Sequence, residues 1–496
     1  MARLTGRSRG CQTCIKRRIK CNEETPACYQ CVSAGWDCPG PVEGVIFVDM
    51  SEGVRQKRTR HTSRPSNKKL QNTRKSNSSP DSTVTAPILD SVERGNLIFQ
   101  ASKLPTSYQP SRGDIFRDLY LANFISLQDA SMHPWINHLP KLASSSTGHS
   151  ELYGIRAATL ALYAKLSHNQ DLELEAAKWY SKGLDAQREQ LPLAAKSQSY
   201  SPCIHKAVGA ALMFSYFESV ICTLPMGWMQ HYAAAIKMFE IAGPENCQTG
   251  LMHMFFCSMR VAAFITALTE DQPSVFASIL WCTVPFQQTE KTPFDKLVDI
   301  LLQLPSCLPY RNEMRKTRNS HVTTSESLRR YLETTASHIL SQLDEFWQEN
   351  KDAIDPDYDQ RLIQTITSHS SNKVDGQQSI PFTSPANAYF TSMYDAGRFI
   401  TLGLLEAASL VPSLYNQAVI MHGASILSSA VYCETQGLFN GVSFSMVFPI
   451  KLVCLLSPSE LQRSLAQDTL LKWGSERGLS GICKVAAPSY LDRSHG

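Results

Sequence analysis

The 496-residue chain lacks the sequence patterns that mark several common classes of protein. It contains no H-E-x-x-H, G-x-S-x-G or P-loop pattern, and no G-x-G-x-x-G follows a strand-like run. No continuous apolar stretch reaches the ~18 residues of a membrane span. The first ten residues, "MARLTGRSRG", are basic and polar, without the apolar core of a secretory signal. We therefore expect a protein that is not an enzyme, does not enter a membrane and works in a reducing compartment.

Histidine is absent between Cys11 and Cys38, a segment rich in cysteine. Two copies of the spacing C-x2-C-x6-C, shifted by 17 residues, supply six of the chain's 15 cysteines: Cys11, Cys14, Cys21, Cys28, Cys31 and Cys38. Two thiolates three residues apart can bind one ion, and the lack of histidine disfavours mixed Cys/His zinc sites. The other nine cysteines are scattered singly, as in a reduced protein. We interpret the repeat as a zinc site.

The number of cysteines limits how zinc can bind. Two tetrahedral ions need eight sulfur positions, so the six cysteines can serve two ions only if two thiolates bridge them. One ion held by four of the six is the alternative. The repetition of the unit favours two ions, because a single ion leaves one half of the repeat without a role.

The two halves of the repeat differ in charge. The first half carries Lys16, Arg17, Arg18 and Lys20, whereas the equivalent positions of the second half are Ser33, Ala34, Gly35 and Asp37. Residues 12 to 20 contain no Gly or Pro, so they can form a short helix with an exposed basic end. Arginine and lysine on such a helix can contact guanine edges in the major groove or nearby phosphates. The alternative is that the cations merely offset the net charge of −2 that six thiolates and two zinc ions would carry.

Residues 11 to 38 resemble the fungal binuclear zinc cluster DNA-binding domain. The shared features are the six cysteines, the stretch "CIKRRIKC" and a proline, Pro26, two positions before the fourth cysteine. The resemblance implies two zinc ions bridged by Cys11 and Cys28, and double-stranded DNA as the partner. It also implies that Arg17 and Arg18 read a CGG-type triplet, in a nuclear regulator of transcription by RNA polymerase II. A zinc-bearing adaptor that binds another protein is the alternative.

Basic residues continue beyond the cysteines. Residues 1 to 80 contain 16 Lys+Arg and 6 Asp+Glu, and the stretch 54–75 has nine cations and no acid. A segment this polar cannot form a core, so residues 39–110 are interpreted as a disordered basic linker. We expect nuclear import and phosphate contacts from Arg55, Lys57, Arg58 and Arg60, with a plain solvated linker as the alternative. No sustained heptad repeat occurs between residues 40 and 110, so a homodimer would have to form through the remainder of the chain.

Residues 111–496 show helical patterning and predict a large all-helical domain. "WMQHYAAAIKMFEIAGP" is expected to end as a helix at Gly243 and Pro244, and Ser459 with Gln462 fits a capping box. The polar stretches "RKTRNSHVTTSES" and "SHSSNKVDGQQS" predict long surface loops. The fold class is therefore mainly α: a small zinc cluster of two short helices, residues 11–38, followed by a helical domain.

The helical region resembles the fungal-specific transcription factor regulatory domain. The residues that carry the resemblance are Trp228, His231, Gly243, Pro244, Arg260, Phe276, Trp281, Pro285 and Phe286. It implies a regulatory role, with coactivators or a small effector as partners, in control of a metabolic or secondary-metabolite gene cluster. Core packing is the simpler interpretation of Trp228, His231 and Trp281.

One acidic stretch is a candidate surface for coactivators. Residues 342–360 contain seven acids and one lysine, interleaved with three aromatic residues. Acidic and aromatic residues in such mixtures can act as activation segments, and a solvated helix end is the simpler alternative.

Overall fold

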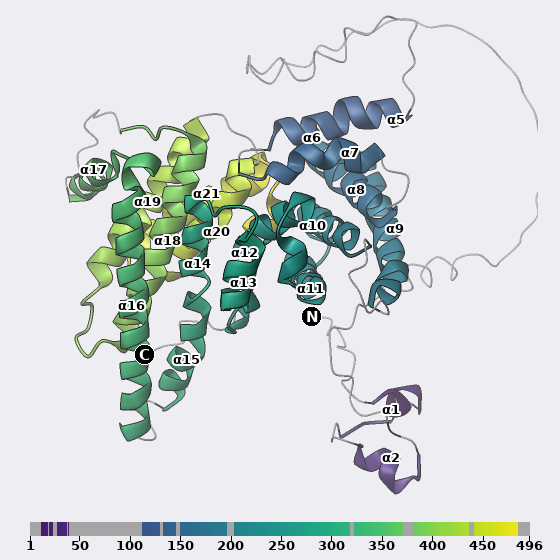
Figure 1. Cartoon of the computed structure of the whole chain (residues 1–496), viewed down its shortest axis with the longest axis horizontal. Coiled ribbons are helices and arrows are strands. Elements are labelled where there is room, and N and C mark those ends of the chain that lie inside the picture. The colour runs from purple at the N-terminus through teal and green to yellow at the C-terminus, as the bar shows by residue number, and fades with distance from the viewer. Residues whose placement is uncertain are drawn as a thin grey trace, which may run out of the picture. The chain divides into compact units, whose positions relative to one another are not determined.

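The computed structural model divides into two compact units, Met1–Leu89 and Asp90–Gly496. The structure describes residues 11–17, 19–22, 27–36, 38, 112–128, 132–144, 149–195, 203–317, 322–370, 380–435 and 441–484. The predicted linker 39–110, with Arg55, Lys57, Arg58 and Arg60, lies outside these ranges. Every regular element in the described ranges is a helix, so the mainly α fold class is confirmed (Figure 1).

The first unit contains two short helices, α1 (Gln12–Arg17) and α2 (Tyr29–Ser33). The helix predicted over residues 12 to 20 is therefore shorter than expected. The Ile19 N–H donates to the carbonyl of Cys14, five residues back, at 3.1 Å, and Ile19 and Lys20 are not helical. Such a bond closes the last turn of a helix.

The second unit is built from helices along its whole described length. Their bounds are α5 (Arg112–Ile115), the π-helical turn η2 (Phe116–Leu121), α6 (Ala122–Ser126), η3 (Pro134–His138), α7 (Leu139–Ser144), α8 (His149–Leu166), α9 (Gln170–Ala195), α10 (Cys203–Ile221), α11 (Gly227–Ala242), η4 (Pro244–Cys247), α12 (Gly250–Glu270), η5 (Val275–Ala277), α13 (Ile279–Thr283), η6 (Val284–Phe286), α14 (Pro293–Leu301), η7 (Leu304–Cys307), α15 (Leu308–Thr317), α16 (Val322–Ile354), α17 (Tyr358–Ser370), α18 (Pro385–Ala408), α19 (Asn416–Thr435), α20 (Gly441–Leu456), α21 (Glu460–Glu476) and α22 (Ser480–Cys483).

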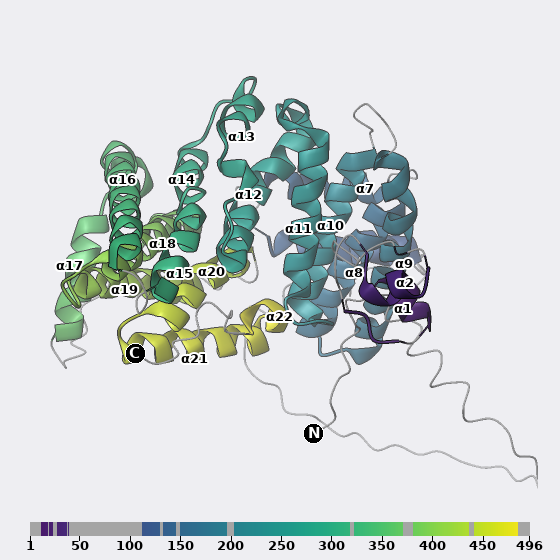
Figure 2. The ribbon, with the colours of Figure 1, turned by 90° about the horizontal axis from the view of Figure 1, so that it is seen from below.

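These helices pack side by side in a row that runs from α9 at one end to α16 and α17 at the other (Figures 1 and 2). At one end α8 contacts both α9 and α10, and at the other α18 contacts α16 and α19. The C-terminal helices connect the two halves, because α21 packs on α19 and α20 while α22 packs on α10. Gly481 permits this last contact, since a Cβ there would lie 2.3 Å from the carbonyl oxygen of Glu218 in α10.

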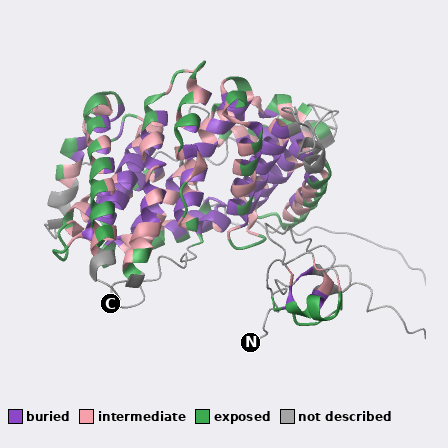
Figure 3. Cartoon of the chain, turned by 60° about the horizontal axis from the view of Figure 1, so that its bottom comes forward, coloured by how far each residue is buried: buried purple, intermediate pink, exposed green. Residues whose placement is uncertain are grey.

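A continuous core extends through the second unit, with buried residues on the inner faces of the helices (Figure 3). Trp281 and His231 both belong to its interior. The Trp281 ring lies 4.9 Å from that of Phe276, and His231 Nε2 lies 2.7 Å from the Tyr180 hydroxyl. Burial lowers the pKa of His231 to about 4, so it is neutral at physiological pH. Core packing thus describes both residues.

Two predicted helix ends are confirmed, one of them in part. α11 ends at Ala242, and Gly243 follows with a φ of +79°, in the region that favours glycine. Ser459 caps α21 by accepting from the Gln462 N–H, as predicted. The prediction of the reciprocal bond of a capping box is wrong. The Gln462 side chain instead accepts from the Ser457 hydroxyl and donates to the carbonyl of Ile420.

The predicted long surface loops are also wrong in part. The first stretch, residues 315–327, lies in the end of α15 and the start of α16, with only 318–321 outside the described residues. α16 has 33 residues, and residues 326–331 near its start are exposed or half-buried, which is why this part of the helix has the composition of a loop. Of the second stretch, 368–379, the first three residues are in α17 and the remainder lies outside the described ranges.

The acidic stretch 342–360 does not present its aromatic residues. Phe346, Trp347 and Tyr358 are all buried, and the Trp347 ring stacks on that of Tyr394 at 4.1 Å. The aromatic residues therefore face the core, and the acids are divided: Glu345, Glu349 and Asp352 are exposed on α16, whereas Asp355, just beyond its end, is buried and pairs with Arg361. In this conformation the three aromatic side chains are not accessible to a coactivator, which corrects the interpretation of this stretch as an activation segment.

α12 departs from the expectation that no stretch matches a membrane span. Its length and mean hydropathy of 1.6 fit one, and 67% of that stretch is buried inside the unit, as in the core helix of a folded domain. Arg260, which lies in this helix, is fully buried and pairs with Asp295 and Asp299. These ion pairs join α12 to α14.

Candidate metal centre

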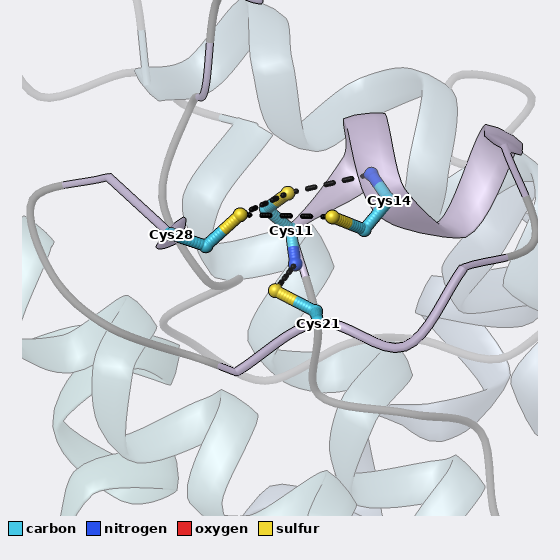
Figure 4. Close-up of side chains that lie close together, drawn as sticks. All are labelled: Cys11, Cys14, Cys21 and Cys28. Carbon is cyan, nitrogen blue, oxygen red and sulfur yellow. Dashed lines mark hydrogen bonds between the residues drawn. The ribbon is translucent and has the colours of Figure 1, made fainter. Parts of the chain in front are cut away.

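The two halves of the cysteine repeat adopt matching local structures. Cys11 immediately precedes α1 and Cys14 lies within it, while Cys28 is the N-cap of α2 and Cys31 lies within it. A C-x2-C spacing across a helix start brings the two sulfur atoms to the same side, because the second residue is about one turn into the helix. Figure 4 shows the side chains of Cys11, Cys14, Cys21 and Cys28 converging.

Hydrogen bonds to the third cysteine of each half repeat the same pattern. The Cys11 N–H donates to Cys21 Sγ at 3.4 Å, and the Cys28 N–H donates to Cys38 Sγ at 3.3 Å. Both bonds span ten residues, the offset that recurs in the sequence. The internal repeat is therefore a repeat of structure as well as of spacing.

The chain after α2 turns back to bring in the last cysteine. Gly35 has a φ of +67°, which favours glycine, and the Trp36 N–H donates to the Cys31 carbonyl at 2.9 Å. This tight turn brings Trp36 and Cys38 against the buried cysteines.

The six sulfur atoms form two overlapping groups of four. One group is Cys11, Cys14, Cys21 and Cys28, and the other is Cys11, Cys28, Cys31 and Cys38; within each group the atoms lie within 4.8 Å of one another. Cys11 and Cys28 belong to both, and their sulfur atoms are 3.7 Å apart. Zinc–sulfur bonds of about 2.3 Å in a tetrahedron place sulfur atoms roughly 3.8 Å apart. The donor set therefore fits two zinc ions that share two ligands.

The electrostatics of the sulfur atoms also require cations. Five of the six cysteines are buried, and Cys38 is half-buried. Desolvation raises the pKa of Cys14 to about 12 and raises the pKa values of Cys28 and Cys31 as well. Thiolates at this spacing repel one another unless a dication lies between them, and a coordinated thiol loses its proton outright. The site is thus suited to zinc and unsuited to free thiolates.

The buried cluster of this unit consists of the cysteines themselves, with Trp36 and Cys38 packed against them. No aliphatic side chain joins that cluster among the residues described here. A module without an apolar core depends on metal binding for its folding free energy.

The structure describes some of the predicted DNA-contacting residues in full and others only in part or not at all. Arg17 at the end of α1 and Lys20 beyond it are exposed, as the prediction requires. Lys16 lies in α1 with its side chain outside the description, and Arg18 lies outside the described residues altogether. Their contacts with DNA stay predictions.

Trp36 is a residue that the sequence reasoning missed. The guanidinium carbon of Arg17 lies 3.3 Å from the centroid of the Trp36 ring, a close cation–π contact that joins the two halves of the repeat. A tryptophan two positions before the last cysteine, the only one between residues 11 and 38 of the sequence, was the available indication.

Comparison with known proteins identifies the first unit's module. Residues 9–41 match the family profile of the fungal Zn(2)-Cys(6) binuclear cluster domain. That domain binds two zinc ions, so the predicted zinc content is confirmed, and its family comprises DNA-binding transcription regulators. Neither the curated proteins nor the solved structures contain a match to the chain.

Proposed function

We propose that this chain is a nuclear, sequence-specific DNA-binding regulator of transcription. One observation carries the proposal: exposed cations at the end of α1 belong to the same small unit as the two overlapping sulfur groups. Metal ligation holds that helix in a fixed orientation, so its basic end is a rigid surface for an anionic partner. The match of residues 9–41 to a family of DNA-binding domains supports the same conclusion.

In this proposal, each cysteine has a defined role. Cys11 and Cys28 bridge the two ions, since both belong to the two sulfur groups. Cys14 and Cys21 complete the first ion's shell, and the remaining two cysteines, Cys31 and Cys38, complete the second. The zinc ions supply structure only, because all four positions of each ion are filled by sulfur and none is open to a substrate.

The basic residues divide into base readers and phosphate contacts. Arg17 and Arg18 hydrogen-bond guanines of a CGG-type triplet, and Lys16 and Lys20 contact phosphates beside it. The linker cations Arg55, Lys57, Arg58 and Arg60 add nonspecific attraction and promote nuclear import. The helical unit performs regulation and any dimerisation.

Mobility-shift titrations of the full-length protein at several salt concentrations test this division. Arg18→Ala should weaken binding to the preferred site by ~1–3 kcal/mol and reduce discrimination between sites. Neutralising the four linker cations should weaken binding to all sequences alike and flatten its salt dependence, with site preference retained. Ser33→Ala is the matched control, because Ser33 is the second-half equivalent of Lys16 and should leave binding unchanged.

Two outcomes would contradict the proposal. A linker variant that loses site preference while Arg18→Ala retains it would show that Arg18 is not a base reader. Absence of any salt-dependent DNA binding by the zinc-loaded protein would favour the protein-binding adaptor instead.

A further inference from the structure

A cavity of about 100 Å³ lies inside the second unit. The cavity is partly open, and its walls come from residues near or within η3 and from α10, α11, α12, α18, α20 and α22. Aromatic rings make up much of the lining: Trp135, Tyr216, Trp228, Tyr232, Tyr389, Phe444 and Phe448. Two of these rings, Tyr216 and Phe444, stack with centroids 4.8 Å apart. The cavity is therefore shaped for a flat or compact apolar group.

The polar groups of the lining include two donors, the Trp135 indole and the Lys451 amine, together with His133, which bonds Ser258 and Ser445. No aspartate or glutamate lines the cavity among the residues described. Trp135 is 2% exposed, and its indole N–H has no hydrogen-bond partner within the described part of the chain. A buried donor without a partner costs free energy, so an acceptor placed in the cavity would recover it.

Lys451 contributes a positive charge to the same cavity. Its Nζ donates one hydrogen bond, at 2.9 Å, to the neutral carbonyl of Lys484, and lies 5.9 Å from the centroid of the Trp228 ring. Desolvation lowers the pKa of Lys451 to about 8, with Cys483, Cys454 and Cys222 as the neighbouring titratable groups. The amine thus remains mostly charged at neutral pH, although its surroundings disfavour the charge.

Three partly or fully buried arginines of this unit pair with carboxylates, whereas Arg156 and Lys451 lie over aromatic rings instead. Arg260 pairs with Asp299, Arg361 with Asp355, and Arg398 with Asp344. In each case a carboxylate compensates the desolvation of the cation. An anion that enters the cavity would do the same for Lys451.

We propose that this cavity binds a small monocarboxylic acid with a flat apolar body. The carboxylate accepts hydrogen bonds from Lys451 and from the Trp135 indole, and the apolar body packs between the aromatic walls. A closed cavity of ~150 Å³ in another protein accommodates benzene, so the roughly 100 Å³ here encloses only part of a single ring or of a short branched chain, and the remainder of the ligand lies in the open part of the cavity. This inference goes beyond DNA binding and does not depend on it.

The probe for the test is 4-fluorobenzoate, and the neutral isostere 4-fluorobenzamide is its control. Both are titrated into the full-length, zinc-loaded protein and followed by fluorine NMR and calorimetry. The acid should bind at one site, and the amide about tenfold or more weakly, because a charge-assisted hydrogen bond is lost. Equal affinities for the two probes, or no binding of the acid, would overturn the proposal.

Four variants locate the site. Lys451→Met keeps the length of the side chain and should weaken the acid about tenfold or more, while Lys451→Arg keeps the charge and should restore most of the affinity. Trp135→Phe removes the indole N–H and should weaken the acid severalfold. Lys237→Met, at an exposed lysine of α11, is the matched control and should leave binding unchanged.

Thermal unfolding of each variant shows whether it is folded during the titration. A folded Lys451→Met that binds the acid as tightly as the unaltered protein would refute the site. A folded Trp135→Phe of unchanged affinity would refute the role given to the indole.

Discussion

Replacement of Cys28 by alanine should cost the protein both zinc ions, whereas replacement of Cys38 should cost only one. Cys28 belongs to both sulfur groups and Cys38 to one. Removing Cys38 leaves the group of Cys11, Cys14, Cys21 and Cys28 complete. Removing Cys28 leaves three sulfur ligands in each group, so neither ion keeps a full shell.

The size of the effect follows from the free energy of zinc binding. Structural zinc sites of four ligands bind with roughly 10–16 kcal/mol, or about 2.5–4 kcal/mol for each ligand. Loss of one ligand should therefore weaken an ion by roughly 10²–10³-fold. Cys38→Ala should show this loss for one ion, and Cys28→Ala should show it for both.

Competition with a chromophoric chelator, followed by metal analysis of the retained protein, measures both quantities. We expect two tightly held zinc ions in the unaltered chain, one in Cys38→Ala and none in Cys28→Ala. Cys282→Ala changes a cysteine of the helical unit and should retain two. Equal zinc retention by Cys28→Ala and Cys38→Ala would refute the assignment of Cys28 as a bridge.

Three further predictions concern other parts of the chain. Trp36→Leu should change DNA affinity by roughly 0.5–2 kcal/mol with zinc content unchanged, and should have no effect when Arg17 is already alanine. Additive effects of the two substitutions in a double-mutant cycle would contradict the contact. Burial raises the pKa of Glu151 from 4.5 to about 7, so its contribution to stability is complete below pH 4.5 and is lost as the pH rises to about 7. Glu151→Gln should remove this pH dependence, up to about 3 kcal/mol in denaturant unfolding, and identical pH profiles would argue against it. Fragment 1–110 should sediment as a monomer, because it has no heptad repeat. A stable dimer of this fragment would refute the assignment of dimerisation to the helical unit.

The metal centre could be predicted from the sequence because a ligand set depends on residue type and spacing. The sequence offset of ten residues recurs in the hydrogen bonds of Cys11 to Cys21 and of Cys28 to Cys38. The Gly243 helix end was equally accessible, since a positive φ that favours glycine is a local property of the backbone. These features involve residues close together along the chain.

Composition was misleading where a polar stretch forms one face of a helix. The start of α16 has the composition of a loop, but it continues into a helix that packs on the core from Leu332 onward. The aromatic residues of 342–360 resembled an accessible segment, and packing of Trp347 on Tyr394 buries them. In both cases the deciding contacts come from other helices.

Residue types and their spacing were sufficient to predict the zinc ligands, the helical character of the described residues and the unequal charge of the two halves of the cysteine repeat. The tertiary structure alone decided that Arg17 stacks on Trp36, that Arg260 pairs with Asp299, and that Lys451 shares a cavity with Trp135. The two kinds of feature differ in how far apart along the chain the contacting residues lie. Helix formation and metal ligation depend mainly on neighbours along the chain, whereas burial and pairing of a charge depend on which distant helices pack around it.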